Sequence, residues 1–261
     1  MALGALILWF CFPFFKKQKQ VIALNKVTVS FTKRIVLDQI SFNINQGEIL
    51  GMLGPNGVGK STIFNLITGL IKPDFGSILF NDTNVLDYPI SERTTKFKIG
   101  YVPQYGGYFH DLTLIENLNA IGEVLIKNNQ ERISKIDELI AKFELESVVN
   151  IKAKFLSGGQ KKKLVIALTL LGNPKILLLD ECFAALDVLT IKMLQEIIVN
   201  LQEENQITIC ICDHQARDLL SCVDRAIVLS NGKIIASGSP NEIIKDSVAK
   251  SAYFGDEFKI N

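Results

Sequence analysis

The chain has 261 residues, of which 48% are hydrophobic, enough for one large domain or two lobes around a buried core. Its 28 lysine and arginine residues nearly balance its 27 aspartate and glutamate residues, so no overall basic field recruits nucleic acid, and we expect no nucleic-acid partner. The chain has only two histidines, which argues against a histidine-based metal centre. Its five cysteines, an odd number without Cys-x-x-Cys spacing, are typical of reduced core thiols in a cytosolic protein.

The chain begins with an uncharged segment, MALGALILWFCFPFF, followed immediately by KKQK. These 15 residues, interrupted by Pro13, fall short of the ~20 that a membrane-spanning helix needs. No basic residue precedes the apolar run, which argues against a secretory signal. Three interpretations remain: a membrane-surface anchor, a half-inserted segment, or an upstream start codon that adds residues outside the fold. We favour the last, with residues 1–20 as an extension ahead of a domain over residues 21–238.

Two segments, VIALNKVTVSF and RIVLDQISFNI, are β-rich and predict strands ahead of a glycine-rich loop. The loop lies in GEILGMLGPNGVGKST, where Ile49 to Leu53 reads as a strand and Ser61 to Leu70 as a helix. The spacing Gly54-x-x-x-x-Gly59-Lys60-Ser61 is that of a phosphate-binding P-loop. The alternative, a glycine-rich turn that matches by chance, is disfavoured by the strand-loop-helix context.

In a P-loop, the backbone N–H groups and the helix N-terminus converge on the β-phosphate. Lys60 would reach the β- and γ-phosphates, and the Ser61 hydroxyl would ligate Mg²⁺. The predicted nucleotide-binding residues of the loop are Gly54, Pro55, Asn56, Gly57, Val58, Gly59, Lys60, Ser61 and Thr62.

Residues from about Ser91 to Leu156 have helical periodicity and little strand signal, as in ERISKIDELIAKFELESVV. The unbroken apolar runs KILLLD and ITICICDH then predict central strands covered on both faces. Asn231-Gly232 between two apolar segments predicts a hairpin. The chain therefore reads as an α/β core interrupted by a helical insertion at about residues 101–160.

Acidic side chains follow the first of these buried strands, at the sheet edge where ligands of open α/β sheets bind. Asp180 would hold the Mg²⁺ that Ser61 also ligates, and Glu181 is placed to polarise an attacking water. His214, just beyond the next buried strand, reaches the same edge and could contact the γ-phosphate. A lone histidine there is more often structural.

Leu156-Ser157-Gly158-Gly159-Gln160 precedes a helix that begins KKKLVIAL. Ser-Gly-Gly at a helix N-terminus is a second anion-binding device. One nucleotide needs only one P-loop, so this motif suggests that another copy of the chain supplies it.

In their order from about Ile22 to Gly238, these motifs resemble the ATP-binding cassette (ABC) ATPases, whose signature is LSGGQ. The resemblance implies a P-loop fold with a RecA-like mixed sheet, an antiparallel β-subdomain and a helical insertion. It implies ATP and Mg²⁺ as ligands and a homodimer in which ATP is sandwiched head-to-tail. The partner's ATP would then contact Ser157, Gly158, Gly159 and Gln160.

The resemblance also assigns roles to residues outside these motifs. Phe31 takes the position that stacks on adenine, Gln104 of YVPQ joins Ser61 and Asp180 at Mg²⁺, and Asp187 belongs to the D-loop. The catalytic residues are then Glu181, His214 and Gln104. The departures from the family pattern, which remove no phosphate, metal or water contact, are Cys182 for proline and Lys161, Lys162, Lys163 and Leu168 for arginine. We therefore expect an active ATPase.

The resemblance further implies separate integral membrane subunits, contacted from the cytoplasmic face of the inner membrane. Tyr105, Tyr108 and Phe109 would line the coupling groove, unless they are ordinary core residues. The C-terminal extension, residues 239–261, together with CDHQARDLLSCVDRAIVLSNGKIIASG, is similar to ATPase subunits of lipopolysaccharide exporters. Branched-chain amino-acid importer ATPases share much of the pattern and remain the alternative. A non-transport ABC ATPase is less consistent with a single cassette that has no long coiled-coil insertion.

Overall fold

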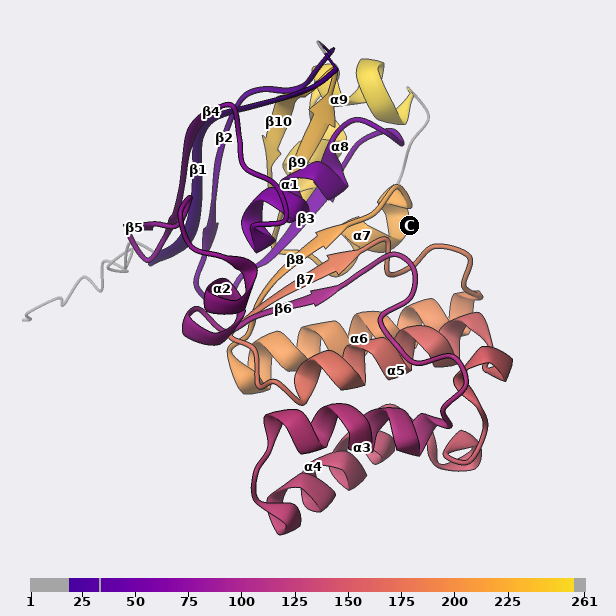
Figure 1. Ribbon diagram of the computed structural model, residues 1–261. Helices are drawn as coiled ribbons and strands as arrows, with labels where there is room; N and C mark the ends of the chain where they lie inside the picture. The colour runs from indigo at the N-terminus through magenta and orange to yellow at the C-terminus, as the bar shows by residue number, and fades with distance from the viewer. Residues whose placement is uncertain (1–18, 33, 256–261) are drawn as a thin grey trace, which may run out of the picture.

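Two β-sheets form the frame of the computed structural model, which describes residues 19–32 and 34–255 (Figure 1). The predictions made for residues 1–18 and 256–261 lie outside the described residues. The smaller sheet is antiparallel, with the strand order β2-β1-β4-β5. Its strands are β1 (Gln20–Phe31), β2 (Arg34–Asn45), β4 (Phe75–Phe80) and β5 (Thr83–Asn84).

The larger sheet has the order β10-β9-β3-β8-β7-β6, in which only β10 runs antiparallel to its neighbour. Every residue of β3, β7 and β8 is buried, which confirms the central strands predicted from apolar runs. The predicted hairpin is also confirmed, because Asn231 and Gly232 both have positive φ, 48° and 73°. The strands are β3 (Ile49–Leu53), β6 (Ile99–Val102), β7 (Ile176–Asp180), β8 (Thr208–Cys212), β9 (Arg225–Ser230) and β10 (Lys233–Gly238).

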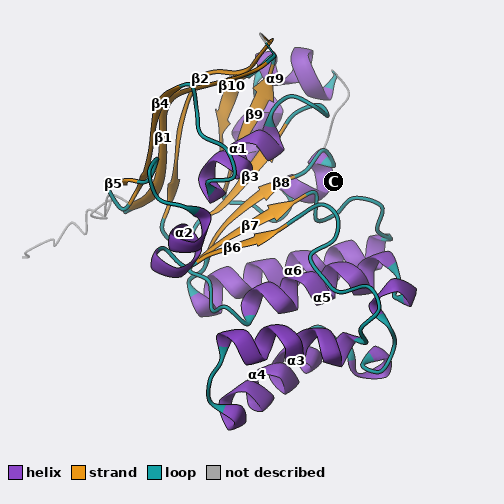
Figure 2. Cartoon of the chain, in the orientation of Figure 1, coloured by secondary structure: helices purple, strands orange, loops and turns teal. Residues whose placement is uncertain are grey.

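Helices cover both faces of the larger sheet (Figure 2). Helix α1 lies between the two sheets, α5 and α6 cover the opposite face, and α3 and α4 form a further layer beyond α5. The longer helices are α1 (Lys60–Thr68), α3 (Leu114–Leu125), α4 (Asn129–Lys142), α5 (Gly158–Leu170) and α6 (Val188–Asn205). The shorter ones are α2 (Ile90–Lys96), α7 (Ala216–Leu220), α8 (Pro240–Lys245) and α9 (Ser247–Ala249). Short 3-10 turns at Glu146–Val148 and Ala153–Phe155 and a π turn at Lys250–Phe254 complete the helical segments.

Strand β3 separates two hydrophobic cores. Leu50 and Met52 point into the core between the sheets, which contains α1. Ile49 and Leu53 point into the core beneath the larger sheet, which contains α5, α6 and the helical layer beyond them. This alternation along a fully buried strand fixes its register, because a slip of one residue would exchange the two sets.

The stretch from about Ser91 to Leu156 contains a strand that the helical prediction missed. Strand β6 lies within it and pairs in parallel with β7 at the edge of the larger sheet. At four residues with an interior glycine, Gly100, it is too short for a strand period to stand out. The helical layer begins later, at Leu114, where Thr113 and Glu116 form a capping box.

Arg93 of α2 is a buried cation that ties α2 to the end of α1. Its side chain is 1% exposed, and its guanidinium donates hydrogen bonds to the Leu66 and Ile67 carbonyls at 2.6 and 3.0 Å. It also donates to the carbonyls of Tyr88 at 3.0 Å and Val85 at 2.7 Å. A positive charge is favoured at the C-terminal end of a helix, so Arg93 stabilises the helix that follows the P-loop.

We expect Arg93→Met to lower the free energy of unfolding by about 3 kcal/mol, since it removes several charge-assisted hydrogen bonds from a buried site. Urea unfolding monitored by circular dichroism measures this change. The exposed Arg34 supplies the control, and Arg34→Met should stay within about 0.5 kcal/mol of the wild type. Equal stability of the two variants would show that Arg93 does not anchor α1.

Candidate nucleotide-binding site

The carboxyl ends of parallel strands bring the predicted catalytic residues to one edge of the larger sheet. The P-loop follows β3, Asp180 ends β7, Asp213 follows β8, and Gln104 lies two residues beyond β6. Asp180 pairs with Cys212 across the strands, so β7 and β8 end at the same level. This edge is where open α/β sheets bind their ligands.

At two of its glycines, the P-loop packs closely against other segments of the same chain. Gly54 has φ of +152°, and a Cβ there would lie 2.6 Å from the Leu229 carbonyl oxygen. Gly59 has φ of +113°, and a Cβ there would lie 2.6 Å from Leu37 Cδ2. Only glycine combines these backbone angles with so little space. The glycine spacing in the sequence therefore reflects the tight fold of this loop.

The Lys60 ammonium lies within the P-loop. Its Nζ donates to the carbonyls of Gly54 at 2.6 Å and Pro55 at 3.1 Å, and the residue is only 5% exposed. Among the described residues, no carboxylate forms an ion pair with it. Lys60 also begins α1, whose N-terminus receives no side-chain cap. A buried cation beside an uncapped helix N-terminus favours binding of an anion such as phosphate.

Asp180 supplies a buried carboxylate next to the first turn of α1. It is 3% exposed and accepts hydrogen bonds from Ser61 Oγ at 3.3 Å and from the Tyr101 hydroxyl at 3.2 Å. Burial raises the pKa of the Asp180 carboxyl. Hydroxyl and carboxylate oxygens are ligands that Mg²⁺ prefers, so Ser61 and Asp180 fit this ion. The amide of Gln104, the third predicted ligand, is instead directed to Glu181.

The three predicted catalytic side chains lie together. Glu181 Oε2 accepts a hydrogen bond from Gln104 Nε2 and lies 3.8 Å from His214 Nδ1. The Glu181 side chain is 14% exposed, so the carboxylate is shielded but reachable. Its backbone is left-handed, with φ of 45°, a conformation that costs a non-glycine residue about 1–3 kcal/mol and that clusters at functional sites.

The loop that carries His214 is held from two sides. Asp213 is fully buried and accepts hydrogen bonds from the backbone N–H groups of Phe183 at 3.0 Å and Gln215 at 2.9 Å. From the C-terminal π turn, the Tyr253 hydroxyl donates to the His214 carbonyl oxygen at 2.8 Å. Burial raises the pKa of Tyr253 to about 12, so the phenol keeps the proton that it donates.

The signature residues form the start of α5. Ser157 Oγ accepts from the Gln160 N–H at 3.2 Å, and Gln160 Oε1 accepts from the Ser157 N–H at 2.9 Å, which is a capping box. Ser157 and Gly158 are exposed. Gly159 packs against Thr190, where a Cβ would lie 2.7 Å from Cγ2.

The D-loop residue Asp187 caps α6 beside the signature. Its carboxylate accepts hydrogen bonds from the Thr190 N–H at 2.9 Å and the Thr190 hydroxyl at 2.6 Å, and these bonds lower the pKa of Asp187. Among the described residues, no hydrogen bond or ion pair joins residues 157–160 to the P-loop. The signature is thus presented on the surface, apart from the P-loop of its own chain.

Two of the three predicted groove residues expose their rings. Tyr105 is 83% and Phe109 52% exposed, whereas Tyr108 packs against the core beneath the larger sheet. Asn117 of α3 is fully buried and fixes the Phe109 backbone: its Nδ2 donates to the Phe109 carbonyl at 3.0 Å, and its Oδ1 accepts from the Phe109 N–H at 2.7 Å. This exposure does not fit the alternative that Phe109 is a core residue.

Phe31 ends β1 and is 48% exposed. It pairs with Arg34 at the open end of the β1–β2 ladder. Further along β2, Leu37 lies against Gly59 of the P-loop. The exposed ring is therefore at the end of the hairpin that touches the P-loop, with a face available for stacking.

Sequence reasoning missed three side chains of this region. Tyr101 lies within YVPQ, whose resemblance to the family pointed only to its glutamine. Lys162 is the middle residue of a lysine triplet, and burial lowers the pKa of its ammonium group. Tyr253 lies in a C-terminal stretch without a chemical motif. The three consecutive lysines are visible in the sequence, but nothing in the run indicates that the middle one contacts the nucleotide site.

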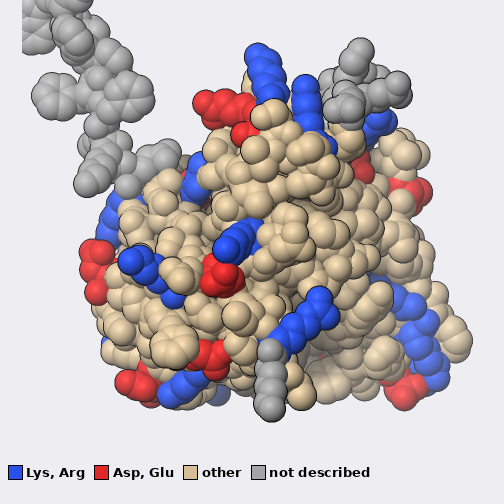
Figure 3. Space-filling view, turned by 90° about the horizontal axis from the view of Figure 1, so that it is seen from above, with Lys and Arg blue, Asp and Glu red and all other residues tan. Residues whose placement is uncertain are grey.

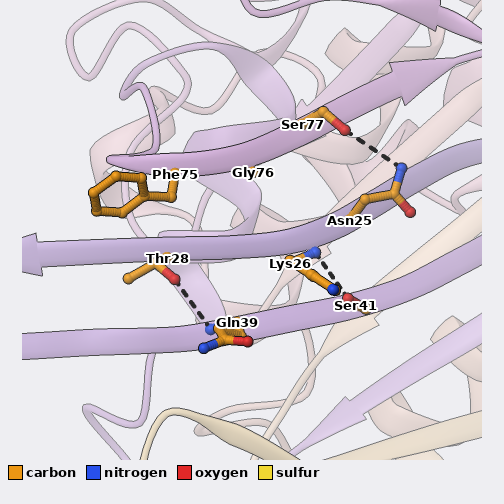
Figure 4. Close-up of a pocket in the computed structure, with 8 residues that line it drawn as sticks. All are labelled: Asn25, Lys26, Thr28, Gln39, Ser41, Phe75, Gly76 and Ser77. Carbon is orange, nitrogen blue, oxygen red and sulfur yellow. Dashed lines mark hydrogen bonds between the residues drawn. The ribbon is translucent and has the colours of Figure 1, made fainter.

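A separate hollow lies on the outer face of the smaller sheet and shares no residue with the P-loop (Figure 4). Its polar groups bond to one another, because Lys26 N–H donates to Ser41 Oγ at 2.8 Å and Gln39 N–H to Thr28 Oγ1 at 3.2 Å. Phe75, at its rim, is 72% exposed. These groups satisfy one another across the strands, so the hollow adds nothing to the nucleotide site.

Charged side chains of both signs are scattered over the face seen in Figure 3, without a field of one sign. The cysteines that the structure describes, Cys182, Cys210, Cys212 and Cys222, are free and buried, as predicted. Within residues 19–32 and 34–255, no three or more His, Cys, Asp or Glu side chains gather as a metal cluster. In the same ranges, no helix has the length and apolar character to cross a bilayer.

Known proteins resemble this chain in both sequence and fold. Residues 37–184 match the sequence profile described as ABC transporter. The lipopolysaccharide export system ATP-binding protein LptB of Haemophilus influenzae is 35% identical over 92% of this chain and 99% of its own. The cbiO1 structure from Clostridium perfringens, part of the ABC transporter complex cbiONQ, superposes with a TM-score of 0.79 at 29% identity, covering 90% of this chain and 94% of its own. The dimeric bacterial ABC transporter cassette MJ0796 gives a TM-score of 0.76 at 30% identity, covering 84% and 98%.

Proposed function

We propose that this chain, an ATP-hydrolysing subunit that belongs to the ABC transporter family, powers lipopolysaccharide export from the inner membrane toward the outer membrane. The observation that carries the chemistry is the meeting of Ser61, Asp180, Gln104 and Glu181 at one sheet edge. Lipopolysaccharide is proposed as the transported molecule because relatives named as lipopolysaccharide export ATP-binding proteins align over most of the chain.

ATP binds in this proposal with its β- and γ-phosphates in the P-loop. The Lys60 ammonium exchanges its carbonyl acceptors, Gly54 and Pro55, for phosphate oxygens, which accept stronger, charge-assisted hydrogen bonds. Ser61 and Asp180 would hold Mg²⁺, which would neutralise phosphate charge when bound. Phe31 stacks on the adenine through its exposed ring.

Hydrolysis uses the carboxylate beyond β7. Glu181 accepts a proton from the attacking water as the oxygen bonds to the γ-phosphorus and the bridging P–O bond breaks, which leaves ADP and phosphate. The Gln104 amide holds this carboxylate in place through its hydrogen bond. His214, whose backbone carbonyl accepts a hydrogen bond from Tyr253, would contact the γ-phosphate from the end of β8.

A second copy completes each site. The exposed Ser157 and Gly158 of one copy close over the γ-phosphate bound to the other, and a dimeric relative supports this arrangement. Val188 and Leu189, which follow the D-loop and are 68% and 78% exposed, would be covered in the closed dimer of this proposal. Contacts made only in the closed dimer shift the population toward closure when ATP binds.

The proposed assembly also contains a pair of integral membrane subunits that dock at the cytoplasmic face of the inner membrane. Exposed aromatic side chains concentrate interface energy, and Phe109 is held rigidly with its ring outward. Phe109→Ala should weaken assembly by about 2 kcal/mol or more, roughly thirtyfold in affinity. ATP turnover by the isolated subunit should stay within about threefold, because no phosphate contact is lost.

Co-purification with the membrane subunits and the solo ATPase rate measure the two effects. Phe75→Ala is the matched control, because Phe75 is exposed on the smaller sheet, outside the proposed groove. Undiminished assembly of Phe109→Ala would contradict the docking role. The identity of the co-purified membrane subunits tests the transporter assignment, since permeases of an amino-acid importer would support the alternative.

A further inference from the structure

Lys162 lies in the second turn of α5 and binds backbone carbonyls of two other segments. Its Nζ donates to Pro103 O at 3.3 Å, Gln104 O at 3.1 Å and Asp180 O at 3.4 Å. An ammonium group has three N–H donors, so these contacts use all of them. The side chain thereby ties the start of α5 to the loop after β6 and to the end of β7.

Two of these three carbonyls belong to residues that carry the chemistry, and the third belongs to the residue directly before Gln104. Gln104 and Asp180 contribute their own carbonyls, and Glu181 directly follows Asp180. A shift of these backbone atoms moves the side chains that would hold Mg²⁺ and polarise water. Since the Gln104 amide also bonds to Glu181, Lys162 reaches the catalytic carboxylate through both segments.

The helix that carries Lys162 also carries the signature. Residues 157–160 form the capped first turn of α5, directly ahead of Lys162. The flanking lysines do not share its contacts: Lys163 Nζ lies 3.9 Å from Glu144 Oε2, and the Lys161 side chain has no hydrogen bond or ion pair within the part of the chain that the structure describes. Among the contacts of the described residues, the middle lysine alone of the triplet connects the signature helix to the nucleotide site.

We propose that Lys162 is a positioning residue that couples the two nucleotide sites of the dimer. The proposal rests on the proposed function, in which the signature of one copy closes on the ATP of the other. When the signature moves onto that phosphate, α5 moves with it, and Lys162 carries the displacement to Gln104 and Asp180 of its own copy. Occupancy of one site thus sets the position of Glu181 in the other.

Lys162→Met tests this role in the purified full chain, because it keeps an unbranched side chain and removes the ammonium. We expect kcat for ATP hydrolysis to fall about tenfold or more, since small displacements of catalytic groups cost large factors in rate. The Hill coefficient for ATP should fall to that of independent sites. The Kd for ATP should stay within about threefold, because Lys60 and the P-loop are untouched.

Two further variants complete the test. Lys163→Met makes the same chemical change one residue away and should leave kcat and the Hill coefficient unchanged. Lys162→Arg keeps a charged donor and should restore most of the rate. Unchanged kcat and cooperativity in Lys162→Met would overturn the proposal, as would a wild type without cooperativity. A joint fall of kcat, ATP affinity and melting temperature would show a merely structural role. Failure of the proposed function looks different, because the wild type itself would then hydrolyse no ATP.

Discussion

Lys60→Ala should reduce ATP turnover by at least about a thousandfold, because it removes a preorganised cation from the phosphate site. Lys60 is nearly fully buried within the P-loop and donates to the loop carbonyls of Gly54 and Pro55, so its ammonium is already placed for phosphate oxygens. Steady-state phosphate release measures the loss, and calorimetry should show that ATP binding is also weakened.

The control for this change is a lysine outside the site. Lys72 pairs with Asp87 on the surface and its side chain is 68% exposed, so Lys72→Ala should leave turnover within about twofold. If Lys60→Ala retained near wild-type turnover, the P-loop assignment would be wrong.

Glu181→Gln should hydrolyse ATP about a hundredfold to a thousandfold more slowly while still binding it. The amide has the shape of the carboxylate but cannot accept the proton of the attacking water. Because the P-loop remains intact, ATP stays bound and closed dimers should accumulate. Single-turnover hydrolysis and size-exclusion chromatography with ATP measure the two effects.

A surface glutamate provides the matched comparison. Glu138→Gln alters an exposed ion pair with Lys135 and should change neither rate nor oligomeric state. Normal turnover in Glu181→Gln would remove that carboxylate from the mechanism, and loss of ATP binding would assign it a binding role instead.

Local patterns in the sequence were enough to predict most of the frame that positions the site. Strands β3, β7 and β8 are unbroken apolar runs because both faces are buried, so their burial is visible in composition. The Asn231-Gly232 turn was predictable because both residues accept positive φ. Strand β6 could not be predicted in this way, because it has only four residues and is placed in the sheet by its pairing with the distant strand β7.

The parts of the site that could not be predicted depend on contacts between distant segments. Nothing in a lysine triplet tells which ammonium folds inward, and the Lys162 acceptor at Gln104 lies 58 residues away in the chain. Similarly, Tyr253 reaches the His214 carbonyl across 39 residues. The sequence also left open whether Phe109 was core or surface, since that depends on how the buried Asn117 holds the loop.

ATP-driven release of lipopolysaccharide from proteoliposomes would show whether this chain powers lipopolysaccharide export. The vesicles would contain this chain with its co-purified membrane subunits, and release would be followed with and without ATP. We expect release that requires ATP, stops in Lys60→Ala and falls with the hydrolysis rate in Glu181→Gln. Intact ATP hydrolysis with no lipopolysaccharide release, accompanied by ATP-driven uptake of branched-chain amino acids in the same vesicles, would contradict the proposed function.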